Sequence, residues 1–426
     1  MSDTSNYQLS TVNSQLIPSG YKQTEVGVIP EEWDVKSLAD VGHFRTGPFG
    51  TLLKADEYYA SEGTPLVSVR DIGEGVLTFD EHTPLVPPAV VRRLPQYVLN
   101  SGDIVFGRKG GVERSAMVQD SQAGCFLGSD GIRIRPSKAC ISLFLTYQLQ
   151  RDEIRSWLLQ NATGTTMASM NQGILRRVSL PFPRETEQSA IAEALSDADA
   201  LLGGLERLIA KKRDLKQAAM QQLLTGQTRL PGFQGEWEVK RMGSVLRFQV
   251  GFPFSSKFFN EKEQGIRLVK NRDLKSDDQV FYYSDKYDPV FLVHNGDVLV
   301  GMDGDFLPCL WAKGPALLNQ RVGRIVPLSG LNRIFSFYYL LEPLKEIEVA
   351  TASTTVKHLS HGDIEDIQKP LPTFEEQKAI AEVLSDMDTE LTALEQRWEK
   401  ARALKQAMMQ ELLTGRTRLP VAETAE

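Results

Sequence analysis

Two stretches of the chain carry apolar residues at steps of mostly three and four. In residues 188–231 the recurring positions are Ile191, Leu195, Ala198, Leu202, Leu205, Ile209, Leu215, Ala219 and Leu223. In residues 377–420 they are Ile380, Leu384, Met387, Leu391, Leu394, Trp398, Ala401, Met408 and Leu412. An apolar seam with a period of about 3.5 residues predicts long helices that supercoil on a partner.

The two stretches are copies of each other. They align without a gap at an offset of 189, and of 44 aligned positions 16 differ and 28 are identical. A helix of about 40 residues rises about 60 Å and cannot bury its own seam. Each copy therefore needs a partner, and the nearest one is the other copy. Two unrelated amphipathic surface helices are the alternative, and the closeness of the repeat disfavours it.

The segments outside the helices have a globular pattern. Short β-rich runs lie at 65–69, 103–106, 132–134, 268–270, 280–283, 297–300 and 322–326, and one helix is predicted over 141–160. Short strands separated by glycine turns predict an α/β or α+β fold.

The second globular segment repeats the first only at short anchors. Residues 32–36, 69–72 and 102–105 return as 236–240, 271–274 and 296–299, and almost nothing between them matches. Two similar helices would suit two copies of one partner. Two domains that share anchors but differ elsewhere would suit two different targets.

These patterns divide the chain into six parts. They are a flexible N-terminal segment 1–20, a first globular domain 21–183, a first repeated helical segment 184–231, a second globular domain 232–370, a second repeated helical segment 371–420 and a tail 421–426. We expect the two helical segments to form an antiparallel coiled coil within the chain.

Composition narrows the class of protein. The chain is 41% hydrophobic and 24% charged, as in ordinary globular proteins. It has no run of 18 apolar residues, no signal-peptide pattern and only three cysteines, so we expect a cytoplasmic protein with no membrane partner. The net charge of −7 mildly disfavours nucleic-acid binding, although binding depends on local potential.

Recognisable catalytic and metal-binding motifs are absent from the sequence. There is no phosphate-binding loop, no dinucleotide-binding glycine motif and no Asn-Pro-Pro or Asp-Pro-Pro motif of amino-methyltransferases. His358 and His361 are three residues apart but have no third ligand in range. Asp303 and Asp305 are flanked by glycines, which indicates a turn more than a metal site. We predict no catalytic residue and no metal site.

With the repeat and the two domains in view, the chain resembles the specificity subunit of Type I restriction–modification systems. The residues that carry the resemblance are Leu371-Pro372, 376–381, 384–386 and 404–415 in the helical copy, with 29–33, 319–325 and 355–360 in the domains. The helical motifs are specific, whereas the domains match only at their anchors.

The resemblance implies a role in DNA recognition without chemistry. Residues 21–183 and 232–370 would be target recognition domains, each reading one half of a bipartite, asymmetric site on double-stranded DNA, and residues 184–231 and 371–420 would be the helical spacers. The helices would set the spacing and dock two modification (methyltransferase) subunits, which use S-adenosylmethionine to methylate the N6 of adenine. Restriction subunits would cut DNA with ATP and Mg. This chain itself would bind no cofactor.

Candidate DNA-binding residues are polar or basic residues in glycine-rich turns beside predicted strand ends. In the first domain they are Arg45, Thr46, Lys54, Arg70, Arg108, Lys109, Arg114, Thr165 and Thr166. In the second they are Lys257, Lys270, Arg272, Asn319, Gln320, Arg321, Thr354, Thr355 and Lys357. For each residue a solvated surface charge or a salt bridge is the competing interpretation. Base-reading residues should differ between the domains, which favours Arg108-Lys109, whose counterparts are Met302-Asp303.

Two other functions remain open from the residues alone. One is a coiled-coil scaffold that binds only proteins, which would show no DNA binding even with modification subunits present. The other is a self-contained DNA methyltransferase or nuclease, which would act without partners and which the missing motifs disfavour.

Overall fold

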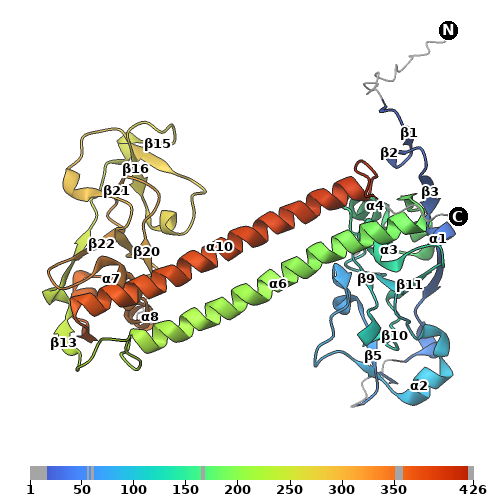
Figure 1. The fold of residues 1–426 in the computed structure, drawn as a ribbon, viewed down its shortest axis with the longest axis horizontal. Coiled ribbons are helices and arrows are strands. Elements are labelled where there is room, and N and C mark those ends of the chain that lie inside the picture. The colour runs from blue at the N-terminus through green and yellow to red at the C-terminus, as the bar shows by residue number, and fades with distance from the viewer. Residues whose placement is uncertain (1–16, 55–56, 59–61, 165–167, 351–357, 421–426) are drawn as a thin grey trace, which may run out of the picture. The chain divides into compact units, whose positions relative to one another are not determined.

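The computed structural model describes residues 17–420 except 55–56, 59–61, 165–167 and 351–357 (Figure 1). The chain forms two compact units, one of Met1–Leu205 with Arg397–Glu426 and one of Glu206–Gln396. Each unit thus combines one globular domain with parts of two long helices, α6 (Glu185–Leu223) and α10 (Phe374–Leu412).

The domain of the first unit is built from short strands and short helices. Its strands are β1 (Tyr21–Thr24), β2 (Gly27–Pro30), β3 (Asp34–Ser37), β4 (Gly42–Thr46), β5 (Thr64–Val67), β6 (Gly75–Val76), β7 (Leu85–Val86), β8 (Ile104–Gly107), β9 (Ser115–Met117), β10 (Phe126–Leu127), β11 (Gly131–Pro136) and β12 (Ser179–Phe182). Its helices are α1 (Leu38–Val41), α2 (Pro88–Arg93), α3 (Ser142–Leu149), α4 (Asp152–Asn161) and α5 (Gln172–Leu175), with 3-10 turns η1 (Gly50–Leu52), η3 (Val69–Asp71), η4 (Pro95–Tyr97) and η5 (Asp120–Gln122).

The domain of the second unit has the same kind of elements. Its strands are β13 (Glu238–Arg241), β14 (Leu246–Val250), β15 (Phe259–Asn260), β16 (Ile266–Val269), β17 (Phe281–Tyr283), β18 (Leu292–Val293), β19 (Val298–Gly301), β20 (Pro308–Leu310), β21 (Ala316–Leu318), β22 (Val322–Pro327) and β23 (Gln368–Leu371). Its helices are α7 (Arg333–Tyr339), α8 (Leu341–Ala350) and α9 (His361–Glu365), with 3-10 turns η6 (Met242–Ser244), η7 (Ser256–Phe258), η8 (Asn271–Leu274) and η9 (Pro289–Phe291).

The sheets of the two domains share the order of their central strands, although the number of strands in each sheet differs. In the first, a sheet of order β4-β11-β8-β9-β6 lies beside one of order β10-β5-β7. In the second, the corresponding orders are β14-β22-β19-β20 and β15-β17-β16-β21-β18. Most pairings are antiparallel. One parallel pair recurs at the same place in both domains, β5 with β10 and β16 with β21, and the first domain has a second parallel pair, β6 with β9. The expected α+β fold with two pseudo-repeated domains is confirmed.

In the first unit, the start of α6 pairs with the end of α10. Asp199 on α6 accepts a hydrogen bond from Tyr147 at 2.8 Å and forms an ion pair with Lys405 on α10 at 2.5 Å. Burial, together with the bond to Asp199, raises the pKa of Tyr147 above its usual range. A side chain of the domain is thereby joined to both helices.

In the second unit, the roles of the two helices are exchanged. Asp388 on α10 accepts a hydrogen bond from Tyr338 at 2.6 Å and forms an ion pair with Lys216 on α6. Lys212 of α6 pairs with Glu390 at 2.7 Å, so rising numbers on α6 face falling numbers on α10. The helices therefore run antiparallel, as predicted.

The predicted apolar seam is mostly correct. Ile191, Leu195, Leu205, Ile209 and Leu223 of α6 are buried, and so are Ile380, Leu384, Leu391 and Leu412 of α10. Leu215 is an error of the prediction, because its side chain is 48% exposed; Leu404, at the equivalent place on α10, is 61% exposed. The period of the seam does not determine which side chain faces the other helix at this point; Lys216, rather than Leu215, turns toward α10.

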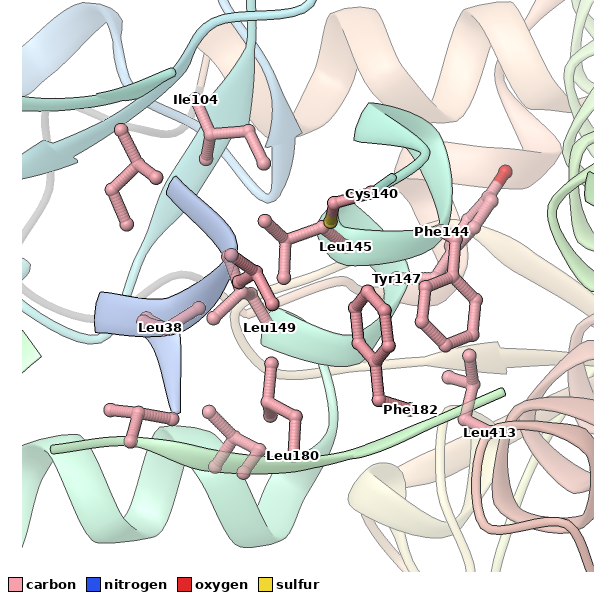
Figure 2. Close-up of a cluster of buried hydrophobic side chains, with 14 of the residues drawn as sticks. Leu38, Ile104, Cys140, Phe144, Leu145, Tyr147, Leu149, Leu180, Phe182 and Leu413 are labelled. Atoms are coloured by element: carbon pink, nitrogen blue, oxygen red, sulfur yellow. The ribbon is translucent and has the colours of Figure 1, made fainter. Parts of the chain in front are cut away.

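The end of each helical copy is part of a domain core. Figure 2 shows Leu413, just after α10, beside Phe182 and near Phe144 in the core of the first unit. Leu412 and Leu413 belong to this core, and their counterparts Leu223 and Leu224 belong to the core of the second unit. The apolar ends of the helices are thus anchored by the hydrophobic effect.

All seven predicted β-rich runs overlap observed strands, but the predicted helix over 141–160 is wrong as a single element. It is two helices, α3 and α4, because Arg151 between them is extended, with φ −62° and ψ 140°. The Arg151 guanidinium is buried and donates to the Gln148 side chain at 3.1 Å. Asp152 and Glu153 then begin α4, where acidic side chains favour a helix start.

A buried carboxylate joins three parts of the first unit. Glu187, in the first turn of α6, is 3% exposed and accepts a hydrogen bond from the Trp33 indole at 3.0 Å. Arg418, beyond the end of α10, donates to both carboxylate oxygens, and this bonding raises the pKa of Arg418.

The second unit contains the same arrangement with the helices exchanged. Glu376, in the first turn of α10, is 1% exposed and accepts from the Trp237 indole at 3.1 Å. Arg229, beyond the end of α6, donates to both of its oxygens. We call these two groups the carboxylate clamps; each holds the start of one copy, the end of the other and a domain tryptophan.

Replacing Arg229 or Arg418 by Ala should destabilise the corresponding unit by about 1–3 kcal/mol, because a buried carboxylate loses its charged partner. Thermal and urea unfolding of the purified chain would measure the effect. The control is Arg213→Ala, which removes an ion pair with Glu395 whose arginine is 63% exposed and should change stability by less than about 0.5 kcal/mol. Equal effects of the three substitutions would contradict a special role for the clamps.

Candidate nucleic-acid interface

In the second domain, four predicted DNA-binding residues meet around one hollow. Its lining consists of Lys270, Asn271, Arg272, Phe281, Asp303, Asn319 and Arg321. These residues come from η8, β17, the loop after β19 and the turn between β21 and β22. The positions are neighbours because β16 pairs with both β17 and β21, while β19 pairs with β22.

The cations of this hollow lie against an aromatic ring. The Lys270 Nζ is 3.2 Å from the ring centroid of Phe281, and the Arg272 Cζ is 5.3 Å from it. Arg272 also donates to the Gln279 carbonyl at 3.0 Å and lies 3.4 Å from Asp273. Burial lowers the pKa of the Lys270 ammonium. Cations held over an aromatic face are partly desolvated and oriented, which suits them to bind an anion such as phosphate.

Asp303 is the acidic centre of the hollow. Its carboxylate lies 2.9 Å from Arg321 and 3.0 Å from the Nδ1 of His358, and its carbonyl accepts from the Asn271 side chain at 2.6 Å. Asp305, two residues on, pairs with Lys275 instead. The acidic pair therefore serves ion pairs, and no group of three or more metal-ligating side chains occurs in the part of the chain that the structure describes.

The remaining candidates of the second domain are placed differently. Gln320 is exposed in the turn between β21 and β22, and Lys257 is exposed on η7 outside the group that lines the hollow. Thr354, Thr355 and Lys357 lie outside the described residues.

The first domain places Arg108 and Lys109 at the corresponding loop, after β8. The Arg108 Cζ lies 4.5 Å from the ring centroid of Phe49, which is itself 49% exposed just after β4. Lys109 is 3.9 Å from Asp130 in the turn before β11. Arg114 lies in the same loop after β8, with its guanidinium against Gly111. These cations and the exposed ring form one polar and aromatic surface at the end of the sheet.

Three other candidates of the first domain have side-chain contacts within the domain, and a fourth, Lys54, is exposed. Arg70 pairs with Asp80 at 2.6 Å and lies 3.4 Å from Asp71, and Thr46 accepts from the Gln172 side chain at 2.7 Å. Arg45 lies 5.8 Å from the ring of Tyr97 and faces the buried Arg133 across the β4–β11 pair. Lys54 is exposed, and its backbone amide donates to Glu57 at 2.8 Å. Thr165 and Thr166 lie outside the described residues.

The sequence-based search missed the acidic and aromatic members of both surfaces. It sought cations and small polar groups, and so omitted Asp130, Asp303, His358, Phe49 and Phe281 from the candidates. The shared glycines of 106–110 (FGRKG) and 300–304 (VGMDG) already set Lys109 against Asp303, but the sequence alone does not show that each has a partner of opposite charge.

The comparisons with known proteins agree with this architecture. A family model described as the Type I restriction modification DNA specificity domain matches residues 30–212 and 234–403. The Type I restriction enzyme EcoBI specificity subunit of Escherichia coli is 38% identical over 185 residues, which are 42% of this chain and 39% of that one, less than two thirds of its length. The putative type I restriction enzyme MjaX specificity subunit of Methanocaldococcus jannaschii is 26% identical over 94% of this chain and 97% of its own.

Two solved structures share the fold. The S subunit of a Type I restriction–modification system from M. genitalium superposes with a TM-score of 0.58 at 16% identity, over 89% of this chain and 96% of that one. A chain from a study of complex assembly and conformational transition of the type I R-M system gives 0.54 at 18% identity, over 91% and 99%. Because the family model matches more than half of the chain, this protein belongs to the family of Type I restriction–modification DNA specificity subunits.

Proposed function

We propose that the chain is the non-catalytic specificity subunit of a Type I restriction–modification complex, and that each domain reads one half of a bipartite, asymmetric DNA site. The proposal rests on one observation. The two domains share the same backbone arrangement, but they carry different side chains at the equivalent ends of their sheets. A shared frame suits one mode of docking on DNA, and different side chains suit two different half-sites.

The candidate surfaces suit this role chemically. Lys270 and Arg272 in the second domain and Arg108 and Lys109 in the first supply cations for phosphate or base edges. Asn319 adds an amide, which pairs with adenine in the major groove. S-adenosylmethionine, ATP and Mg²⁺ would be bound by partner subunits, namely two modification subunits and the restriction subunits.

The long helices support a role in spacing. α6 and α10 each contain 39 residues, and at 1.5 Å per residue each rises roughly 60 Å. Specific half-sites on one face of a duplex repeat about every 34 Å. Two paired helices of this length are stiff enough to fix a constant number of base pairs between the half-sites.

Equivalent exposed leucines support the docking of two copies of one partner. Leu215 of α6 is 48% exposed and Leu404 of α10 is 61% exposed, and the two positions correspond in the repeat. Each lies beside a lysine that pairs with the other helix, Lys216 and Lys405. Each unit therefore offers a similar apolar spot on a similar helix surface, as two identical modification subunits would require.

Exchanging residues 232–370 for the same region of another family member should change one half of the methylated site and leave the other half and the spacer unchanged. The reason is that the second domain carries its own reading surface, while the helices and the first domain are kept. Methylation mapping of cells that express the chimera with the modification subunits would measure the site. The reciprocal exchange of residues 21–183 should change only the other half; a change in both halves from either exchange would refute independent reading.

Leu215→Asp should remove one of the two modification subunits, Leu404→Asp should remove the other, and the double variant should remove both. Loss of a buried leucine contact weakens association by about tenfold to a hundredfold. Native mass spectrometry of the assembled complex would count the subunits. Leu208→Asp is the control, because Leu208 is 39% exposed but corresponds to an arginine, Arg397, in the other copy. Full complexes from Leu215→Asp, Leu404→Asp and the double variant would exclude this docking surface.

A further inference from the structure

The two domains carry an ion pair of opposite polarity at the same place. In the first domain the loop after β8 supplies the cation, Lys109, and the turn before β11 supplies the anion, Asp130, 3.9 Å away. In the second domain the loop after β19 supplies the anion, Asp303, and the turn before β22 supplies the cation, Arg321, 2.9 Å away.

Backbone bonds establish that these positions correspond. The amide of Arg108 donates to the carbonyl of Asp130 at 2.7 Å, and the amide of Met302 donates to the carbonyl of Arg321 at 3.0 Å. The strands concerned, β8 with β11 and β19 with β22, pair in the same antiparallel way.

A third contact repeats as well. Lys109 forms a β-bridge with Ser169, and Asp303 forms one with His358. The frame around the two loops is therefore the same in both domains, and the sign of the charges is what differs.

The fold does not need either pair. Lys109 and Asp130 are 53% and 48% exposed, and Arg321 and Asp303 are 55% and 32% exposed. Exposed ion pairs contribute little to stability. The charges at these positions can therefore differ between the domains with little effect on stability. They lie at the sheet end that also carries other candidate DNA-binding residues.

A cation beside an anion matches the major-groove edge of a G·C base pair. Guanine presents the acceptors O6 and N7, which lysine and arginine contact, and cytosine presents the N4 donor, which aspartate accepts. The O6 and N4 atoms of one base pair lie about 3 Å apart, as hydrogen-bonded atoms do. The atoms of the Asp303–Arg321 pair are separated by a similar distance, 2.9 Å, and those of the Lys109–Asp130 pair by 3.9 Å.

We propose that each ion pair reads one G·C base pair of its half-site and that the two domains read it in opposite orientations. In the first domain guanine faces the loop after β8 and cytosine faces the turn before β11. In the second domain the guanine faces the turn before β22. His358 holds the Asp303 carboxylate, so that Asp303 keeps its orientation when Arg321 moves to the guanine.

This inference rests on the proposed function, and its test keeps the two apart. The complete complex with its modification subunits is expressed with wild-type chain, with Asp303→Arg/Arg321→Asp, or with neutral Asp303→Asn/Arg321→Gln. Methylation mapping gives each site, and selection of bound duplexes from a pool with a randomised second half-site reports preference even where methylation is lost. The control is Arg241→Asp/Asp366→Arg, an exchanged ion pair with 54% and 66% exposed partners.

The exchanged variant should replace G by C at one position of the second half-site, with the first half and the spacer unchanged. The neutral variant should lose roughly tenfold or more discrimination at that position alone. The control variant should keep the wild-type site. Lys109→Asp/Asp130→Lys should produce the same switch in the first half-site.

Two results would overturn the inference while leaving the proposed function intact. One is unchanged preference at every position in the neutral and exchanged variants. The other is loss of all specific binding by the neutral variant, since one missing base-pair contact leaves the others in place. A wild-type complex that gives no split site would instead overturn the proposed function.

Discussion

The structure depends on the burial of one carboxylate at the start of each long helix. Glu187 and Glu376 are almost free of solvent, and a carboxylate in such a place is very costly unless it is paired and hydrogen-bonded. Its charged partner is an arginine beyond the end of the other helical copy, and its second donor is a domain tryptophan. This requirement explains why each unit is assembled from segments far apart in the sequence, and why both copies keep the same ends.

Because buried groups fix the helix ends and the inner strands, the loops at the sheet ends can differ between the two domains. The helix starts, helix ends and inner strands satisfy buried groups, so their residues are constrained in both units. The loops after β8 and β19 carry exposed charges that the fold does not need, and these have opposite signs in the two domains. In the proposed function, specificity would be carried by residues whose replacement costs little stability.

The sequence predicted the parts of the fold that follow from local rules. The helices follow from the repeated apolar seam, and two of the three domain anchors, 69–72 with 271–274 and 102–105 with 296–299, contain turns fixed by an aspartate. Asp71 and Asp273, for example, each accept a hydrogen bond from the backbone amide three residues earlier.

The sequence did not predict features that depend on tertiary packing. The break at Arg151 follows from its buried contact with Gln148, and the outward turn of Leu215 follows from which helix face meets the other helix. Asp130 and Asp303 belong to the candidate surfaces because strand pairing places each of them beside a cation.

The most direct test of the central claim is genome-wide methylation mapping, by single-molecule sequencing, of cells that express the modification subunits with and without this chain. The account predicts a split, asymmetric motif with N6-methyladenine in both halves, which disappears when the chain is absent. A methylation pattern that does not depend on the chain, or a dependent motif that is short and contiguous, would contradict the assignment of two domains to two half-sites.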